Sequence, residues 1–130
     1  MNHAVIGIGS NIQPEVNIPK AISKIGNSHR IIRQSRIVET LPIGPTSQPH
    51  YLNGAVLIET DLELEELKTW LLTVENELGR IRGIDKYAPR TIDLDIVVWG
   101  GEIVDQDVYR RDYLRQAVSE VCPTLEVGNS

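Results

Sequence analysis

The sequence predicts an α+β fold in which helices pack on one face of a mainly antiparallel sheet. Short apolar runs rich in Ile and Val alternate with two stretches whose apolar residues recur at helical spacing. Their order along the chain is β-α-β-β-α-β, which is typical of a ferredoxin-like (split β-α-β) sandwich. The chain has 130 residues, of which 41% are hydrophobic. We therefore expect residues 1–130 to form a single domain.

The first two predicted strands flank a helix. Residues 4–8 are apolar and stop at Gly9, which is typical of a buried strand followed by a turn. The next stretch predicts a helix that has Asn17 as its N-cap and ends at Gly26. Residues 30–40 are rich in Ile and Val and predict the second strand. The helix is expected to bury residues at helical spacing, namely Ile18, Ala21, Ile22 and Ile25.

A proline-rich loop precedes the second β-α unit. Residues 41–50 contain three prolines, which forbid a helix there. Residues 51–60 predict a strand, and Thr60 with Glu63 predicts a capping box that opens a helix over residues 62–78. The expected apolar stripe of this helix is Leu64, Leu67, Leu71, Val74 and Leu78.

The last long strand is predicted over residues 91–99, where apolar residues alternate with others. Beyond it, a short strand over residues 102–104 and a helix or turn over residues 115–121 complete the expected elements. One face of the long strand would carry Ile92, Leu94, Ile96 and Val98, and the other Asp93, Asp95, Val97 and Trp99.

Charge and composition exclude several classes of protein. Thirteen Lys and Arg against eighteen Asp and Glu give a net charge of −5, which argues against a nucleic-acid or acidic-membrane binder. The single Cys excludes an intramolecular disulfide and a Cys-rich zinc site. No apolar run approaches the roughly 20 residues of a membrane helix. We expect a cytoplasmic protein that binds neither nucleic acid nor membrane.

The strongest chemical signal is the pair Asp93 and Asp95. Side chains two residues apart on a strand point the same way, with Cα atoms roughly 6.5–7 Å apart, so the two carboxylates can hold a divalent cation such as Mg²⁺. Four basic residues just upstream suit the oxygens of a triphosphate. This combination predicts metal-assisted phosphoryl transfer. The basic residues are Arg80, Arg82, Lys86 and Arg90.

The same residues also fit a purely structural interpretation. Two acids on an exposed strand can form a solvated edge that deters aggregation. The basic loop can pair with the acidic helix that precedes it.

A second group of residues follows the proline-rich loop. Tyr51 and Asn53 come directly after it, and Thr40 directly before it. An aromatic ring and an amide beside a stiff loop can bind a flat heterocycle by stacking and edge hydrogen bonds. The alternative is that Tyr51 is a residue of the sheet surface and Asn53 a turn or edge residue.

Five segments together resemble the 6-hydroxymethyl-7,8-dihydropterin pyrophosphokinase family. They fall in the order and spacing of the family, from residue 4 to about residue 100. The most specific is the stretch Pro-Arg-Thr-Ile-Asp-Leu-Asp that ends at Asp95. The segments are residues 8–11, 40–45, 48–53, 78–82 and 88–95.

The resemblance implies transfer of pyrophosphate from ATP to the hydroxymethyl group of a dihydropterin, leaving AMP, in folate biosynthesis. Asp93 and Asp95 would hold two Mg²⁺ ions, and together with Arg80 and Arg90 they form the expected catalytic set. The implied ATP-binding residues are Glu75, Arg80, Arg82, Arg90 and Arg111.

The resemblance also implies a pterin site. Tyr51 would stack on the pterin, while Thr40 and Asn53 would hydrogen-bond to its edge. The implied partners are small molecules, and we expect a monomer or a weak homodimer. The full set of implied pterin-binding residues is Thr40, Leu41, Ile43, Tyr51, Asn53, Tyr87 and Tyr113.

The chain departs from the family after Trp99. Members of the family carry a segment with Pro and His that contacts phosphates, whereas residues 101–114 here contain no histidine. Arg111 and Tyr113 match the arginine and the aromatic residue that follow that segment. The resemblance therefore implies a shortened C-terminal part. The alternative function is a non-catalytic or altered relative that binds pterin or nucleotide.

Overall fold

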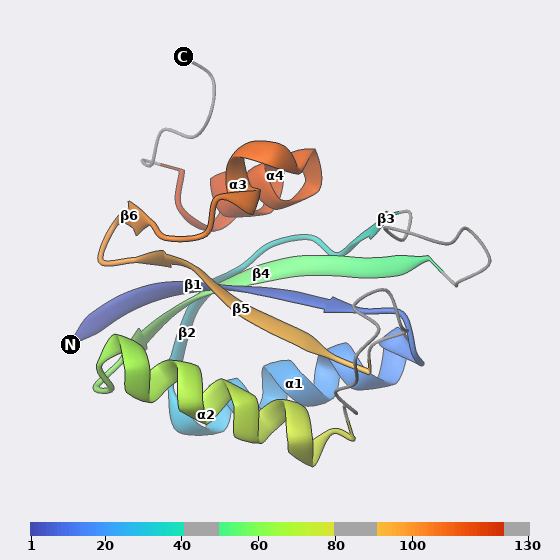
Figure 1. Cartoon of the computed structure of the whole chain (residues 1–130), viewed down its shortest axis with the longest axis horizontal. Coiled ribbons are helices and arrows are strands. Elements are labelled where there is room, and N and C mark those ends of the chain that lie inside the picture. The colour runs from blue at the N-terminus through green and yellow to red at the C-terminus, as the bar shows by residue number, and fades with distance from the viewer. Residues whose placement is uncertain (41–49, 80–90, 124–130) are drawn as a thin grey trace.

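A computed structural model describes residues 1–40, 50–79 and 91–123 (Figure 1). The described residues form a six-stranded sheet in which neighbouring strands pair antiparallel, with strand order β2-β4-β1-β5-β6 and β3 paired to β4. This order places β4 between β1 and β2, as a split β-α-β sandwich requires, so the predicted fold class is confirmed. The strands are β1 (Asn2–Ser10), β2 (Arg30–Gln34), β3 (Val38–Thr40), β4 (Tyr51–Thr60), β5 (Asp93–Trp99) and β6 (Glu102–Ile103).

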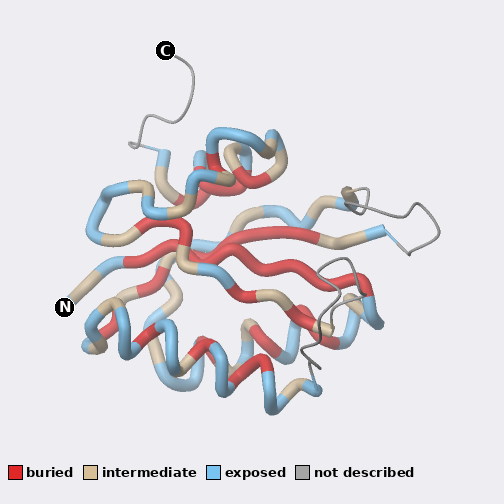
Figure 2. Tube along the Cα trace, in the orientation of Figure 1, coloured by how far each residue is buried: buried red, intermediate tan, exposed pale blue. Residues whose placement is uncertain are grey.

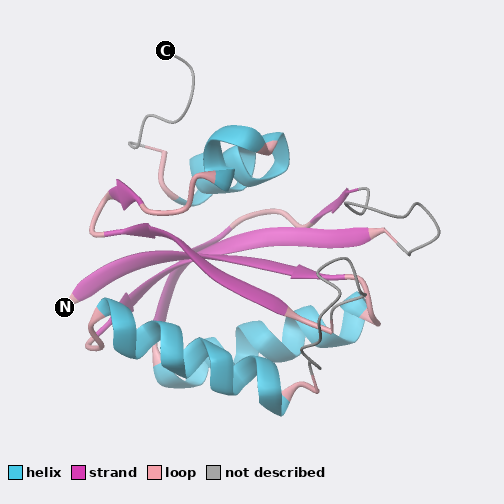
Figure 3. Cartoon of the chain, in the orientation of Figure 1, coloured by secondary structure: helices cyan, strands magenta, loops and turns pink. Residues whose placement is uncertain are grey.

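Helices cover both faces of the sheet, not one face as the sequence predicted. Two long helices lie below the sheet and two shorter ones lie above it (Figures 1 and 3). The upper layer forms because the last helix carries a stripe of Leu114, Ala117, Val118 and Val121 at helical spacing, which is buried against the sheet. The helices are α1 (Pro14–Ser28), α2 (Leu64–Glu77), α3 (Asp107–Arg110) and α4 (Asp112–Val121).

Each face of the sheet has its own apolar core (Figure 2). Ile6 and Ile58 point toward α1 and α2, where Ile25 and Leu67 are fully buried. On the other face, Val5 packs in the core beneath α4. The alternation of β1 thus supplies both cores from one central strand.

The predicted strand over residues 30–40 is wrong in one respect, because it is broken into β2 and β3. Gln34 pairs with Val56 and Val38 pairs with Asn53, so one more residue lies on this side than on β4. At the break, the Ser35 hydroxyl accepts the N–H of Ala55 at 2.8 Å. That side-chain bond takes the place of a ladder bond and lets the chain bulge.

Both long helices begin at other residues than predicted. Pro14 opens α1, whereas Asn17 is buried in its first turn and donates through Nδ2 to the carbonyl of Ile12 at 2.5 Å. The capping box of α2 joins Glu63 and Glu66. Thr60 is not its N-cap, because this residue still belongs to β4.

A bulge in β5 changes the direction of its last side chains. Val5 pairs with Val98 and Ile6 pairs with Ile96, so Val97 is the extra residue. Val97 and Val98 therefore both join the core beneath α4, while Trp99 packs in the core of α1 and α2. The predicted faces of Val98 and Trp99 are wrong for this reason.

The outer end of α4 is tied to the break between β2 and β3. The carboxylate of Glu120 accepts the backbone N–H of Arg36 at 2.8 Å and hydrogen bonds from its guanidinium at 3.1 and 3.2 Å.

In the described ranges, no helix is long and apolar enough to span a membrane.

The contact between His29 and Trp70 predicts a pH-dependent stability. The two rings pack edge to face with centroids 4.5 Å apart, and His29 Nε2 is buried without a hydrogen-bond partner in the described part of the chain. Burial lowers the pKa of His29 below its ordinary value of 6.5, and Asp61 opposes the shift. The unfolded chain therefore takes up this proton first as the pH falls. The free energy of unfolding should fall below pH 6.5, until the pH reaches the lowered pKa.

Urea unfolding at about pH 7.5 and about pH 5 would measure this effect. His29→Phe keeps a ring against Trp70 without a titrating group, so its stability should depend less on pH than that of the wild type. An equal loss of stability in both proteins would contradict the assignment.

Candidate active site

The paired carboxylates lie beside the central strand of the sheet. Gly9 pairs with Asp93 on β5 and with Asn53 on β4, so these two residues flank the same position of β1. Gly7 pairs with Asp95 in the same way. The register of β1 therefore brings together residues that are 40 positions apart in the sequence.

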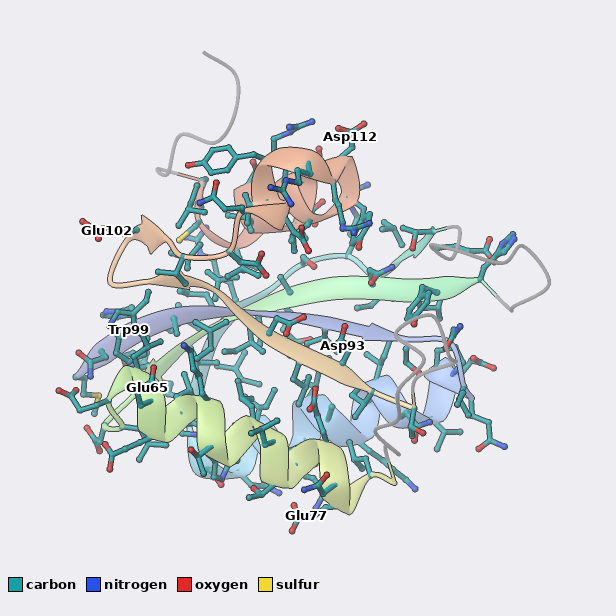
Figure 4. The ribbon with its side chains drawn as sticks, viewed as in Figure 1. Glu65, Glu77, Asp93, Trp99, Glu102 and Asp112 are labelled. Atoms are coloured by element: carbon teal, nitrogen blue, oxygen red, sulfur yellow. The ribbon has the colours of Figure 1, made fainter. Side chains whose placement is uncertain are left out.

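These side chains share the face of the sheet that carries α4. Val97 follows Asp93 by four positions and Ala55 follows Asn53 by two, and both pack in the core beneath α4. β5 begins at Asp93 and β4 begins at Tyr51, and these first residues of both strands extend beyond α4 (Figure 1). Asp93 and Trp99 lie at opposite ends of β5, so the carboxylates are far from the turn to β6 (Figure 4).

Gly9 gives the neighbouring side chains their space. A Cβ atom at this position would lie 2.7 Å from Oδ1 of Asn53 and 3.7 Å from Cδ1 of Tyr51. The first distance is shorter than van der Waals contact permits, so only glycine leaves room for this amide. From the sequence, Gly9 was expected only to start a turn, and this role was not predicted. The signal in the sequence was a second glycine two residues after Gly7 on a buried strand, because glycine in a strand often marks the close approach of another group.

Thr40 holds the amide of Asn53. Asn53 is 9% exposed and donates through Nδ2 to Oγ1 of Thr40 at 2.5 Å. Thr40 pairs with Tyr51 on the neighbouring strand, so β3 and β4 bring all three residues together. The hydrogen bond fixes the direction of the amide.

The first turn of α4 brings Tyr113 to the same region. Burial raises the pKa of the Tyr113 phenol, and the nearby charges of Asp107, Asp93 and Tyr51 raise it further, against the opposing effect of Arg111. Tyr113 also packs against the core that contains Ala55 and Val97, which follow Asn53 and Asp93 on their strands, so it lies on the same face of the sheet as those residues.

Arg111 lies beside α3 at the start of α4. Its Nε is 3.6 Å from Oδ2 of Asp107. Asp107 was not among the predicted site residues, although it stands four positions before Arg111, the spacing of a helical ion pair.

The two aspartates suit Mg²⁺. Asp93 is half-buried and Asp95 is exposed. Among the described residues, no group of three or more His, Cys, Asp or Glu side chains could hold a metal ion. Mg²⁺ usually keeps several waters and binds one or two carboxylates together with substrate phosphates. A two-carboxylate site fits that requirement, whereas zinc would need more protein ligands.

Glu75 lies on α2, on the other side of the sheet. It is 2% exposed, and its Oε2 accepts the backbone N–H of Leu94 at 2.7 Å. Its expected contact with ATP stays a prediction. What the structure shows is a side chain directed at the backbone between the two aspartates.

Six predicted site residues lie outside the described part of the chain. Of the others, the sheet and α4 bring Thr40, Tyr51, Asn53, Asp93, Asp95 and Tyr113 to one face, with Arg111 at its margin and Glu75 beneath it. The six that fall outside are Leu41, Ile43, Arg80, Arg82, Tyr87 and Arg90.

Comparisons with known proteins agree on one family. The sequence model of 7,8-dihydro-6-hydroxymethylpterin-pyrophosphokinase (HPPK) matches residues 5–123. A 2-amino-4-hydroxy-6-hydroxymethyldihydropteridine pyrophosphokinase from Haemophilus influenzae is 34% identical over 139 aligned positions, which cover 98% of this chain and 86% of the relative. The enzyme of that name from Bacillus subtilis is also 34% identical, with 96% of this chain and 81% of the relative covered. A mitochondrial folate synthesis bifunctional protein from Pisum sativum is 39% identical over 80% of this chain and 20% of its own length.

The Haemophilus alignment is longer than this chain, so that relative carries residues with no counterpart here. The match nevertheless runs through every strand and helix that builds the site. The chain belongs to the 7,8-dihydro-6-hydroxymethylpterin-pyrophosphokinase family.

Proposed function

We propose that the protein transfers pyrophosphate from ATP to 6-hydroxymethyl-7,8-dihydropterin in a Mg²⁺-dependent reaction of folate biosynthesis. The products are AMP and the pterin pyrophosphate. The observation that carries the proposal is the placement of Asp93 and Asp95 on the same face of the sheet as Tyr51 and Asn53, across β1, in a member of this family.

The reaction is a displacement at phosphorus. The hydroxymethyl oxygen of the pterin forms a bond to the β-phosphorus of ATP, and the bond from that phosphorus to the α-phosphate oxygen breaks. The hydroxyl proton leaves to solvent, and AMP carries away the bonding electrons. Such a reaction depends mainly on positioning and on stabilisation of charge, and it needs no covalent intermediate with the protein.

Asp93 and Asp95 would hold Mg²⁺, of which two ions are expected, and bound Mg²⁺ supplies positive charge to the triphosphate. Their place on a strand supports this role, because a strand residue is held by its neighbours on the sheet and moves little. Their exposure differs: Asp95 is open to solvent, while Asp93 is half-buried near Tyr113. The pair can therefore meet a ligand that arrives from the α4 side.

The pterin would bind between the aromatic residues of β4 and α4. Tyr113 packs on the face of the sheet that carries α4, and Tyr51 and Asn53 share that face of β4. Thr40 is proposed to hydrogen-bond to the ring edge as well, since its hydroxyl accepts one amide hydrogen of Asn53 and keeps its own hydrogen to donate. The other amide hydrogen and the carbonyl oxygen of Asn53 are the groups that would recognise the edge of the ring. Leu41, Ile43 and Tyr87 are proposed to complete this pocket.

The phosphates would be bound by arginines. Arg80, Arg82 and Arg90 are proposed contacts from the basic loop, with Arg80 and Arg90 closest to the reacting groups, and Glu75 is a further proposed ATP contact. Arg111 is held by Asp107 at 3.6 Å, a distance at which an ion pair is weak. A triphosphate oxygen could therefore replace Asp107 as its partner.

The partners of this reaction are small molecules, and we propose that it runs in the cytoplasm in a monomer or a weak homodimer. The acidic charge balance and the single cysteine support that location.

A binding protein without this activity is the second candidate. It is favoured by the absence of any histidine after His50, since the histidine of the family's Pro-His segment has no counterpart. Calorimetry with the pterin discriminates between the two. In the enzyme, an ATP analogue with Mg²⁺ should change the affinity for the pterin, because both substrates meet at the aspartates. In a binding protein, the affinity for the pterin should not respond.

The first test is formation of AMP. Purified protein with ATP, Mg²⁺ and the dihydropterin alcohol should form AMP and pterin pyrophosphate in equal amounts. Asp93→Asn and Asp95→Asn should each reduce the rate more than roughly 100-fold. Loss of a residue that only supports a metal ligand costs up to about that much, and these two residues are the proposed ligands themselves. Chromatography of both products measures this, and circular dichroism checks the fold.

Glu102→Gln is the matched control, because it removes an exposed carboxylate from β6, far from the site. Its rate should equal that of the wild type. A wild-type protein that forms no AMP above background would overturn the proposed activity.

The second test uses the two glycines of β1. Gly9→Ala should weaken pterin binding and cost about 1–3 kcal/mol of stability, because the new methyl group meets Oδ1 of Asn53 at 2.7 Å. Gly7→Ala is the matched control, since its methyl group would make ordinary contacts with Leu114 and Val97, each at 3.5 Å, and with the carbonyl oxygen of Asp95 at 3.8 Å. Calorimetry and thermal unfolding of both variants measure the difference. Equal pterin affinity in the two variants would contradict the role given to Gly9.

A further inference from the structure

The strand that carries the paired aspartates is exposed at its outer edge. β6 pairs with β5 only at Val98 and Trp99. The N–H of Val104 bonds to the carbonyl of Val97 at 3.0 Å, and along residues 93–96 no strand among the described residues pairs with that edge. Backbone groups at an unpaired edge have no ladder bonds and need other partners. Asp93 and Asp95 pair with Gly9 and Gly7 of β1 on the inner side of the strand, so other contacts must hold the backbone between them on the outer side.

Glu75 supplies one of these contacts from below the sheet. Its Oε2 accepts the N–H of Leu94 at 2.7 Å, and Leu94 is the residue between the two aspartates. Side chains alternate along a strand, so Leu94 points to one face of the sheet while Asp93 and Asp95 point to the other. The backbone nitrogen of Leu94 therefore lies between the two carboxylates along the strand. The carboxyl group thus takes the place of the missing neighbouring strand.

Ser10 supplies a second contact from the central strand. Ser10 is fully buried at the end of β1, and its hydroxyl donates to the carbonyl of Thr91 at 2.7 Å. Thr91 precedes Asp93 by two residues. Glu75 and Ser10 therefore hold the backbone on both sides of Asp93, one at an N–H and the other at a carbonyl.

A role in stability alone does not explain Glu75. Its neighbours on the buried face of α2 are Leu71 and Val74, which pack in the core and bury no polar group there. A carboxyl group that is only 2% exposed costs free energy unless it is bonded. An apolar residue would pack there more favourably. What the apolar residue could not do is hold the N–H of Leu94.

We propose that Glu75 and Ser10 are positioning residues that set the direction and spacing of Asp93 and Asp95, and thereby the affinity of the site for the metal–triphosphate complex. This inference rests on the proposed function. Neither residue needs to touch a substrate for this role. Glu75 acts through the backbone of Leu94, and Ser10 through that of Thr91.

The test compares Glu75→Gln with Glu75→Leu. Glutamine keeps an oxygen that can accept the N–H of Leu94, whereas leucine has a similar size and no acceptor. Electron paramagnetic resonance can measure the binding of Mn²⁺ together with a non-hydrolysable ATP analogue. This measurement gives the metal affinity of the site without turnover. Glu75→Leu should bind the metal about 10- to 100-fold more weakly, and Glu75→Gln should recover most of that loss. The KM for the pterin should stay unchanged, because Tyr51 and Asn53 lie on β4.

Val74→Ala is the matched control. It removes buried atoms from the same helix and lowers stability, but it has no bond to β5. Its metal affinity should equal that of the wild type at a temperature where both proteins are folded. Ser10→Ala should also weaken metal binding, and it serves as the deciding variant if Glu75→Leu does not fold.

Two results would overturn the proposal. The first is that Glu75→Leu loses no more metal affinity than Val74→Ala does. If Glu75→Leu does not fold, the same comparison is made with Ser10→Ala. The other is a Glu75→Gln variant as weak as Glu75→Leu, which would show that the charge matters and the acceptor does not. Neither result depends on formation of AMP, so failure of the proposed activity is seen separately in the wild-type assay.

Discussion

The antiparallel pairing of β1 with both β4 and β5 is the constraint on which the rest of the structure depends. It fixes which residue of each outer strand lies opposite each residue of the central one. Since side chains alternate, the pairing also decides which residues enter each core. Ile6 and Ile8 fill one core, whereas Gly7 and Gly9 leave room on the other face for the side chains of Leu114, Val97 and Asn53. A shift by one residue would exchange the two sets and remove the site.

The two layers of helices have different tasks. α1 and α2 close the larger core, and α2 also reaches the backbone of β5 through Glu75. α4 covers only part of the other face and carries Tyr113 to the edge of the uncovered part. Apolar packing thus holds each helix in place, while one polar residue on each connects it to the site. A site made this way rests on the rigid part of the fold rather than on its connections.

Local patterns in the sequence predicted what depends on nearest neighbours. The alternation around Asp93 and Asp95 correctly predicted a strand with both carboxylates on one face. The features it could not predict depend on distant partners. Val97 becomes a bulge only because of its pairing with β1, and Ser35 interrupts a strand because its hydroxyl bonds to Ala55 on β4. Contacts between residues far apart in the sequence leave no periodic signal in either segment.

The bulge at Val97 has a consequence for how β5 serves both layers of helices. It separates the strand into an inner half, whose phase is set by Gly7 and Gly9, and an outer half that leads into β6. The inner half keeps Asp93 and Asp95 aligned with β1, on the face that carries α4. The outer half changes phase, so that Trp99 turns to the opposite face and closes the core of α1 and α2. One strand thereby presents the carboxylates on one face and seals the core on the other.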